Sequence, residues 1–331
     1  MQTQQDTTPT QVTQPLVTFI VTCHNLPTQM LCECIESILS LSLQRFEREV
    51  IVVDDGSDES PVNELLRFGD DVVYLRKANG GVSTARNMGL RTATGQFIQF
   101  VDGDDTLIQA NYEHCLDIAK VGKTDVIMFD FTHQRNVAPT YNDWEPMSGC
   151  SLMRLHNIQG ASCLCLFRRS ILGELTFTPG VSYGEDEEFT PQLLLRAEQV
   201  VRTTAKAYHY RQHEASATAD KSREGVLRRL DDNLRVIRSL QQKADTLPTA
   251  ERLALERRVA QLTMDHIYNT ITLTRDSSLL RQRLDTMRAD GLFPLPDRNY
   301  TTKYKWFRHL TNSNAGLALL MKALPLMDKE R

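Results

Sequence analysis

Polar and acidic side chains gather directly after short apolar segments at three places in the first third of the chain. The three clusters are His24-Asn25, Asp54-Asp55-Gly56-Ser57 and Asp102-Gly103-Asp104-Asp105. Asp102 and Asp104 are two residues apart, so in an extended backbone their carboxylates point the same way. Hard oxygen ligands of this kind suit Mg²⁺ or Mn²⁺, ions that also bind phosphate oxygens. The pair therefore predicts a site for a metal ion and a phosphate group.

A loop and an acidic run add two further candidates. Asn79 and Gly80 belong to a loop that leads into a predicted helix over residues 83–93, which contains Arg86. The first N–H groups of such a helix, together with an arginine, suit a phosphate. Residues 185–188 are four consecutive acids at the start of another predicted helix. By themselves they predict an acidic helix start, in which like-charged neighbours raise the pKa of each carboxyl.

The predicted elements would bring these clusters together. Short buried strands alternate with amphipathic helices, which is typical of an α/β domain with a mostly parallel sheet flanked by helices. Ligands of open parallel sheets bind outside the carboxyl ends of the strands, where all three polar clusters stand. We predict strands over residues 17–22, 49–54, 72–75, 96–101, 125–131, 162–168 and 200–211, and helices over 27–42, 109–120, 184–197, 223–242, 248–274, 277–287 and 317–324, the last ended by Pro325.

Composition divides the 331 residues into three parts. Residues 1–14 are polar and predict a disordered tail, residues 15–220 form the α/β domain, and residues 221–331 predict a helical region. Residues 1–220 carry 17 basic against 29 acidic side chains, whereas residues 221–331 carry 21 against 13. The overall net charge of −4 argues against a nucleic-acid partner. The first residues show no signal-peptide pattern, and no apolar run reaches about 20 residues. The seven cysteines suit reduced thiols. We therefore expect a cytoplasmic protein.

Five segments of the chain resemble the inverting family 2 glycosyltransferases of the GT-A fold. They match in order and spacing over about residues 15–215, and read VTFIVTCHN, EVIVVDDGSDES, NGGVSTARNMGL, GQFIQFVDGDD and YGEDEEF. The resemblance implies a metal-dependent enzyme that moves a sugar from a nucleotide-sugar, with a UDP-sugar favoured, to an acceptor hydroxyl. It further suggests a glycan or lipid-linked sugar as acceptor, in the synthesis of a surface polysaccharide.

The resemblance also implies a role for each matched segment. Asp54 or Asp55 would hold the base and ribose of the donor, and Asp102 with Asp104 would bind Mn²⁺ or Mg²⁺ and the diphosphate. Asp186 would be the general base, with Glu185 as its neighbour. The remaining donor contacts would come from Asn25, Asn79, Gly80 and Arg86. His24 departs from the aromatic residue common in the family, and the roles of His209 and His213 stay open.

Other functions fit the sequence less well. A sugar nucleotidyltransferase would carry a glycine-rich basic loop where this chain has CHNLPT, and a dehydrogenase would need G-x-G-x-x-G there. A non-catalytic nucleotide-sugar-binding module would not need Asp186. For residues 221–331 we favour helices that pack on the catalytic domain. Dimerisation, a cover over the acceptor site, and peripheral contact with the inner face of the membrane are the alternatives.

Overall fold

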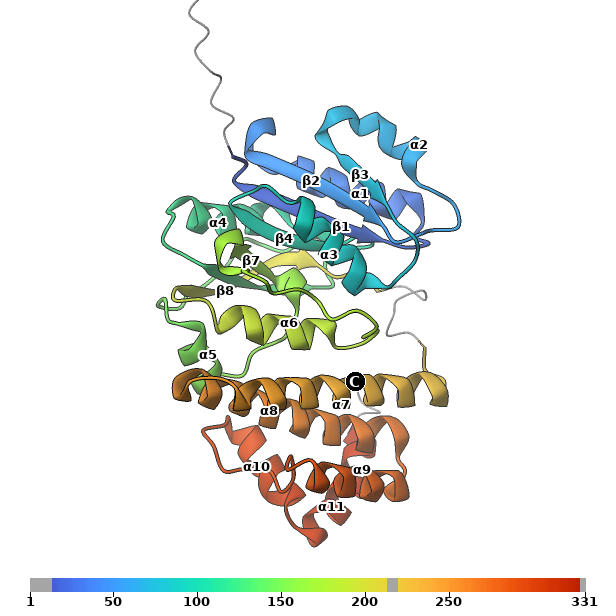
Figure 1. The fold of residues 1–331 in the computed structure, drawn as a ribbon, viewed down its shortest axis with the longest axis vertical. Coiled ribbons are helices and arrows are strands. Elements are labelled where there is room, and N and C mark those ends of the chain that lie inside the picture. Colours follow the sequence, from blue (N-terminus) through green and yellow to red (C-terminus); the bar gives the residue numbers. More distant parts are fainter. Residues whose placement is uncertain (1–13, 213–219, 328–331) are drawn as a thin grey trace, which may run out of the picture.

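The computed structural model of the chain describes residues 14–212 and 220–327, and its elements form two layers (Figure 1). The N-terminal layer is a sheet flanked by helices. The C-terminal layer consists of helices alone, and its two long helices run beneath the sheet layer (Figure 1). The predicted tail, apart from Gln14, and His213 lie outside the described residues.

The described residues form one mixed sheet of eight strands, in the order β3-β2-β1-β4-β7-β6-β8-β5. The four strands β3, β2, β1 and β4 are parallel, β7 runs antiparallel to both β4 and β6, β6 and β8 are parallel, and β5 is antiparallel to β8. The strand bounds are β1 Val17–Cys23, β2 Arg48–Asp54, β3 Val73–Arg76, β4 Phe97–Asp102, β5 Thr106–Leu107, β6 Val126–Thr132, β7 Cys165–Arg168 and β8 Val200–His209.

Both faces of the central strands are covered, which explains their nearly unbroken apolar sequences. All seven residues of β1 are buried, with Phe19 facing one core cluster and Ile20 the opposite one. Helices α1 and α4 complete the first cluster, and α3, α5 and α6 complete the second. Their bounds are α1 Thr28–Leu39, α2 Val62–Leu65, α3 Val82–Thr92, α4 Gln109–Lys120, α5 Gly149–Leu155 and α6 Glu185–Leu194.

The register of the parallel strands aligns the polar clusters. Cys23 lies opposite Asp54, and Thr22 lies opposite Asp102. Just beyond the strands, the Gly103 N–H donates to the Thr22 carbonyl at 2.9 Å. A Cβ at Gly103 would lie 2.9 Å from that same oxygen, so the residue between Asp102 and Asp104 must be small.

The C-terminal layer has its own apolar core, formed by helices α7 to α11. Their bounds are α7 Arg223–Asp245, α8 Thr249–Asn269, α9 Ser277–Ala289, α10 Thr302–Thr311 and α11 Asn314–Met327. The sequence did not indicate α10, and the expected end at Pro325 is wrong, because α11 continues through this residue to Met327. Pro325 costs the helix one backbone hydrogen bond, and Leu320 and Leu324 of the same helix pack into the core of this layer.

Two buried arginines of α8, Arg257 and Arg258, join the layers. Arg257 donates to the carbonyls of Met153, His156 and Asn299 at 2.7–2.9 Å and to Oδ1 of Asn157 at 2.9 Å. These bonds supply partners to backbone carbonyls around the end of α5. The predicted domain boundary at residue 220 stays a prediction. The parts of the chain on either side of it share the buried hydrogen bonds of Arg257.

The cysteines and the helices were both considered in the sequence, and the structure describes both. All seven cysteines are described and all have free thiols, five of them buried. Among the helices of residues 14–212 and 220–327, none combines the length and the apolar character that crossing a membrane requires.

Replacing Arg257 with Met should lower the free energy of unfolding by about 2–4 kcal/mol, because buried carbonyls lose a charged donor. Arg252→Met is the matched control on the exposed face of the same helix and should change stability by less than about 0.5 kcal/mol. Urea unfolding followed by circular dichroism measures both. Equal effects of the two substitutions would show that Arg257 does not join the layers.

Candidate functional site

A cavity of about 300 Å³ opens where the parallel strands end. We call it the donor-side cavity, after the expectation that the nucleotide-sugar donor binds here. It is built from the loop after β1, the start of α3, the loop after β4 and the start of α6. Its lining residues are Thr22, Cys23, His24, Leu26, Asp55, Val82, Ala85, Arg86, Asp102, Asp104, Ser182, Glu185 and Tyr210. Segments far apart in the sequence thus meet at one cavity, as the position of the polar clusters predicted.

A buried guanidinium holds three carboxylates of this region together. Arg86 is 3% exposed, and its Nη2 donates to Asp102 at 3.0 Å. Its Nη1 donates to Glu185 at 3.0 Å and to Asp186 at 2.8 Å. The rings of Phe100 and Phe177 lie beneath it, 5.9 and 5.2 Å from the guanidinium carbon. Arg86 therefore fixes the D-x-D segment relative to the acidic run.

The acidic run at the start of α6 is divided between two tasks. Glu185 and Asp186 turn toward Arg86, whereas Glu187 forms an ion pair with Arg258 of α8. Glu188 accepts a hydrogen bond from Ser239 of α7. Half of the run thus faces the site, and the other half binds the C-terminal layer, a division that the sequence did not indicate.

Burial raises the pKa of the carboxyls at this site. The pKa of Glu185 rises to about 7, first because of burial and then because of Asp186, against the opposing effect of Arg86. Burial also raises the pKa of Asp186, although Arg86 and a 2.6 Å hydrogen bond from Ser162 act in the opposite direction. Burial and Asp102 raise the pKa of Asp105 to about 8. Perturbed carboxyls of this kind are typical of functional sites.

Asp186 lines a second cavity, of about 340 Å³, which we call the acceptor-side cavity after the role expected for Asp186. Asp102 and Tyr210 line both cavities, so the two meet at the D-x-D segment. The remaining lining residues are Phe131, His133, Gln159, Ala161, Cys163, Leu164, Tyr208 and Gln212. The arrangement can hold a carboxylate base on one side of Asp102 and a phosphorylated ligand on the other.

The other residues predicted to contact the nucleotide-sugar differ in their position relative to the cavity. Asp55 lines it, and its carboxylate accepts hydrogen bonds from the N–H groups of Gly80 and Gly81 at 3.1 and 2.7 Å. Asp54 is fully buried and accepts from the Ser57 N–H at 2.8 Å and from the Tyr74 hydroxyl at 2.7 Å. Of the two aspartates, Asp55 is therefore the one at the cavity wall, and Asp54 shapes the loop behind it.

Asn25 and Asn79 lie at the exposed rim. Asn25 exchanges hydrogen bonds with Asp58, accepting from its N–H at 2.8 Å and donating to its carboxylate at 3.1 Å. The amide of Asn79 donates to the ring of His24 at 3.0 Å. These contacts join the loops after β1, β2 and β3. Neither asparagine is among the residues that line the donor-side cavity.

Asp102 and Asp104 suit a divalent cation that shares its ligands with a substrate. Within residues 14–212 and 220–327, no group of three or more His, Cys, Asp and Glu side chains is arranged to hold a metal ion. Two carboxylates at an open cavity are nevertheless a common donor set for Mg²⁺, whose remaining ligands are water and substrate phosphates. The residues present therefore fit a cation that binds together with a diphosphate.

Several residues of the site carried no signal in the sequence. Ser162 and Tyr210 come from segments far from the D-x-D motif, and Asp105 is 1% exposed beside that motif. Only Asp105 could have been suggested by the sequence, as the third acid of the cluster. His209 is buried and shares a 3.1 Å hydrogen bond with Thr106, and it is not among the residues that line either cavity.

Comparison with known proteins identifies a family whose model matches part of the chain. The family model described as Glycosyl transferase family 2 matches residues 18–175. The glycosyltransferase EpsJ of Bacillus subtilis is 28% identical over 220 residues, which cover 62% of this chain and 63% of EpsJ. The minor teichoic acid biosynthesis protein GgaB of the same organism is 27% identical over 199 residues, which cover 57% of this chain and 22% of GgaB. The chain thus spans less than two thirds of these relatives.

Solved structures share the fold over nearly the whole chain. TarS 1-349 of S. aureus in complex with UDP-GlcNAc superposes with a TM-score of 0.68 at 17% identity, covering 95% of this chain and 91% of that one. The mannosyltransferase PcManGT of Pyrobaculum calidifontis, in complex with GDP-Man and Mn²⁺, gives 0.53 at 16% identity, covering 96% and 88%. The expected GT-A fold is confirmed. Residues 18–175 match the model of glycosyltransferase family 2, in agreement with the resemblance of the five sequence segments.

Proposed function

We propose that this protein transfers a sugar from a nucleoside diphosphate sugar to an acceptor hydroxyl with inversion of configuration. The observation that carries the proposal is the bridge made by Arg86 between Asp102 and Asp186, at the junction of two cavities. One cavity offers carboxylates for a cation and a diphosphate. The other offers a buried carboxylate with a raised pKa for a proton.

The donor-side cavity suits a nucleotide-sugar. Asp102 and Asp104 would hold the Mn²⁺ or Mg²⁺, which would neutralise charge on the departing diphosphate. Asp55 at the wall and Val82 at the start of α3 would contact the nucleoside. Support for a UDP-sugar comes from the TarS complex with UDP-GlcNAc, and support for Mn²⁺ comes from PcManGT.

Asp186 is the proposed general base. It would accept the proton of the acceptor hydroxyl as that oxygen attacks the anomeric carbon from the side opposite the diphosphate. Ser162 and Arg86 both bind Oδ1 of Asp186, which fixes the orientation of the carboxylate. Glu185 lies on the donor side and raises the negative charge around the guanidinium.

The rival functions lack comparable support. A sugar nucleotidyltransferase would need a basic glycine-rich loop after β1, where His24 and Leu26 line the cavity instead. A non-catalytic binding module would gain nothing from a buried carboxylate in a separate cavity beside the donor site.

The proposal includes a setting at the inner face of the membrane, where a lipid-linked or polymeric glycan would be the acceptor. The C-terminal layer carries the exposed side chains of Trp306, Leu319 and Leu326, and Lys303 and Lys305 stand near the first of these. Basic and aromatic residues side by side suit an anionic lipid surface. The alternative is that the same layer forms a homodimer. Cosedimentation with anionic liposomes distinguishes membrane binding from dimerisation.

Replacing Asp186 with Asn should reduce sugar transfer by roughly 10²–10⁴-fold, because the hydroxyl loses its proton acceptor. Donor binding should persist, because the amide still accepts hydrogen bonds from Arg86 and Ser162. Release of UDP from UDP-GlcNAc in the presence of acceptor glycans measures the first effect, and calorimetry measures the second. Unchanged transfer would disprove the assignment of the base.

Asp104→Asn should abolish the extra thermal stabilisation that Mn²⁺ gives to the complex with UDP or UDP-GlcNAc. A ligand stabilises the folded protein more when it binds to it more tightly. The amide of asparagine is a weaker ligand for this cation than a carboxylate. Asp117→Asn, on the exposed face of α4, is the control and should retain the effect. Equal responses of both variants would remove Asp104 from the cation site.

Transfer should rise with pH through about 7, because Glu185 must lose its proton before the group of carboxylates around Arg86 is fully ionised. The folded pKa of Glu185 lies above its ordinary value of 4.5, so its contribution to stability is greatest below about 4.5 and is lost as the pH rises through about 7. Glu185→Gln should remove the rise of the rate near pH 7, because the glutamine side chain cannot ionise. A profile between pH 5 and 9 that is the same in both proteins would contradict this role.

A further inference from the structure

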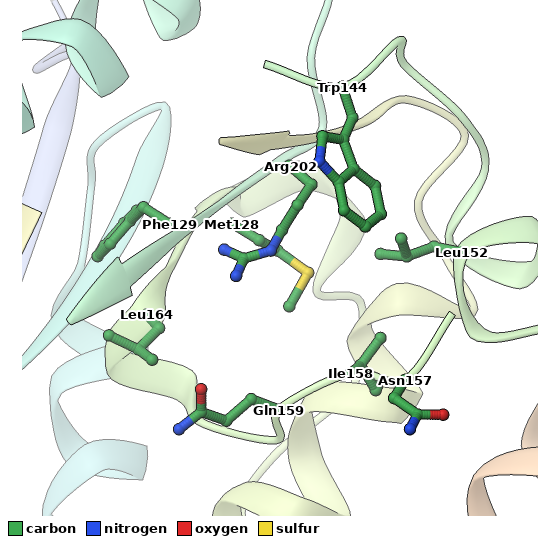
Figure 2. Close-up of a pocket in the computed structure, with 9 residues that line it drawn as sticks. All are labelled: Met128, Phe129, Trp144, Leu152, Asn157, Ile158, Gln159, Leu164 and Arg202. Atoms are coloured by element: carbon green, nitrogen blue, oxygen red, sulfur yellow. The ribbon is translucent and has the colours of Figure 1, made fainter. Parts of the chain in front are cut away.

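A third cavity continues from the acceptor-side cavity, away from the donor. It has a volume of about 290 Å³ and is lined by Met128, Phe129, Trp144, Leu152, Asn157, Ile158, Gln159, Leu164 and Arg202 (Figure 2). Gln159 and Leu164 also line the acceptor-side cavity, so the two spaces share a wall. Phe129 of this cavity and Phe131 of the acceptor-side cavity are two residues apart on β6, which corresponds to about 7 Å along the strand.

The side chains that line this cavity are apolar on some walls and polar on others. Figure 2 shows the indole of Trp144 with Leu152 and Ile158 along one side, and Arg202, Leu164 and Gln159 along the other. The backbone N–H of Trp144 donates to the Arg202 carbonyl at 2.8 Å, and the centres of the indole and the His156 ring are 4.7 Å apart. The aromatic ring is therefore held in place by β8 and by the end of α5.

This combination suits a pyranose ring. A pyranose presents an apolar C–H face, which packs on an aromatic or aliphatic surface, and a rim of hydroxyls, which need a few well-placed donors and acceptors. Trp144 and Met128 provide the first kind of surface. The amides of Asn157 and Gln159 and the guanidinium of Arg202 provide the second.

The charge of the cavity favours a neutral sugar over a phosphate. The one cation among its lining residues, Arg202, forms an ion pair with Asp130 and donates to the Thr203 carbonyl at 3.0 Å. A guanidinium that is already neutralised by a carboxylate attracts an anion only weakly. Its remaining N–H groups can still donate to hydroxyls.

We propose that this cavity binds a neutral pyranose of the acceptor, one unit removed from the sugar whose hydroxyl reaches Asp186. The inference rests on the proposed function, because it takes the acceptor-side cavity as the place of transfer. The enzyme would then prefer an acceptor of at least two linked sugars over a single sugar or a polyol phosphate. The C-terminal layer takes part, because Arg257 holds the Asn157 side chain at the wall.

Tryptophan fluorescence tests the site without a known acceptor. The chain has two tryptophans, so Trp306→Phe leaves Trp144 as the sole reporter. In this variant, cellobiose, lactose or N,N′-diacetylchitobiose should cause a saturable change in emission at concentrations at least about tenfold below those needed by the matching methyl glycosides. A response to glycerol 3-phosphate or inorganic phosphate, with none to the saccharides, would overturn the proposal. So would the absence of any response.

Substitutions of residues that line the cavity distinguish effects on saccharide binding from effects on folding. In the background with both tryptophans, Gln159→Ala changes an exposed side chain and should weaken the disaccharide about three- to tenfold by calorimetry, through the loss of one hydrogen bond. Trp144→Ala should weaken it about tenfold, and Trp144→Phe should largely restore it, because the aromatic surface returns. Equal affinities in all three would refute the site.

Stabilisation by UDP-GlcNAc distinguishes this inference from the proposed function. If the donor stabilises the protein and no saccharide binds at Trp144, only the acceptor subsite is wrong. If UDP-, GDP- and dTDP-sugars all fail to stabilise the protein in the presence and absence of Mn²⁺, the proposed transfer itself is wrong.

Discussion

One buried guanidinium organises the site. Arg86 has almost no contact with solvent, and a charge in that position is tolerated only when it is paired and hydrogen-bonded. Its partners come from two separate motifs, Asp102 at the end of β4 and the pair Glu185 and Asp186 at the start of α6. Three carboxylates share one cation, so the group keeps an excess of negative charge. Burial, followed by the charge of Asp186, raises the pKa of Glu185. The excess of negative charge favours a divalent cation at the neighbouring cavity.

The C-terminal layer supports this arrangement from behind. Glu187 and Glu188 come directly after Glu185 and Asp186 on α6 and bind Arg258 and Ser239 of the helical layer. Arg258 also donates to the Ile158 carbonyl at 2.7 Å, next to the residues that line the acceptor-side cavity and its extension. The helices therefore brace both the helix that carries the proposed base and the loop that forms the acceptor wall.

Three cavities succeed one another along the carboxyl edge of the sheet and the neighbouring strand β6. Asp102 and Tyr210 separate the first two, and Gln159 and Leu164 separate the second and third. A donor, an attacking hydroxyl and a preceding sugar unit would each find a space of suitable polarity. The switch from parallel to antiparallel pairing at β7 makes this possible, because it brings the loop over residues 157–164 beside the end of β4.

Local patterns alone determined the strands of the parallel half, the helices around them and the carboxylates at their ends. Those features depend on the periodicity of apolar residues and on the residue types next to each strand end, both of which are visible within a short stretch of sequence. The tertiary structure alone decided which acids act together: Arg86 joins Asp102 to Asp186, Asp54 turns inward while Asp55 faces the cavity, and Asn25 stays at the rim. It also decided that Ser162, Tyr210 and Trp144 line the site or its extension. The contact between Arg86 and Asp186 joins residues 100 positions apart, and only the packing of the sheet, α6 and the C-terminal helices sets which side chains meet over such a separation.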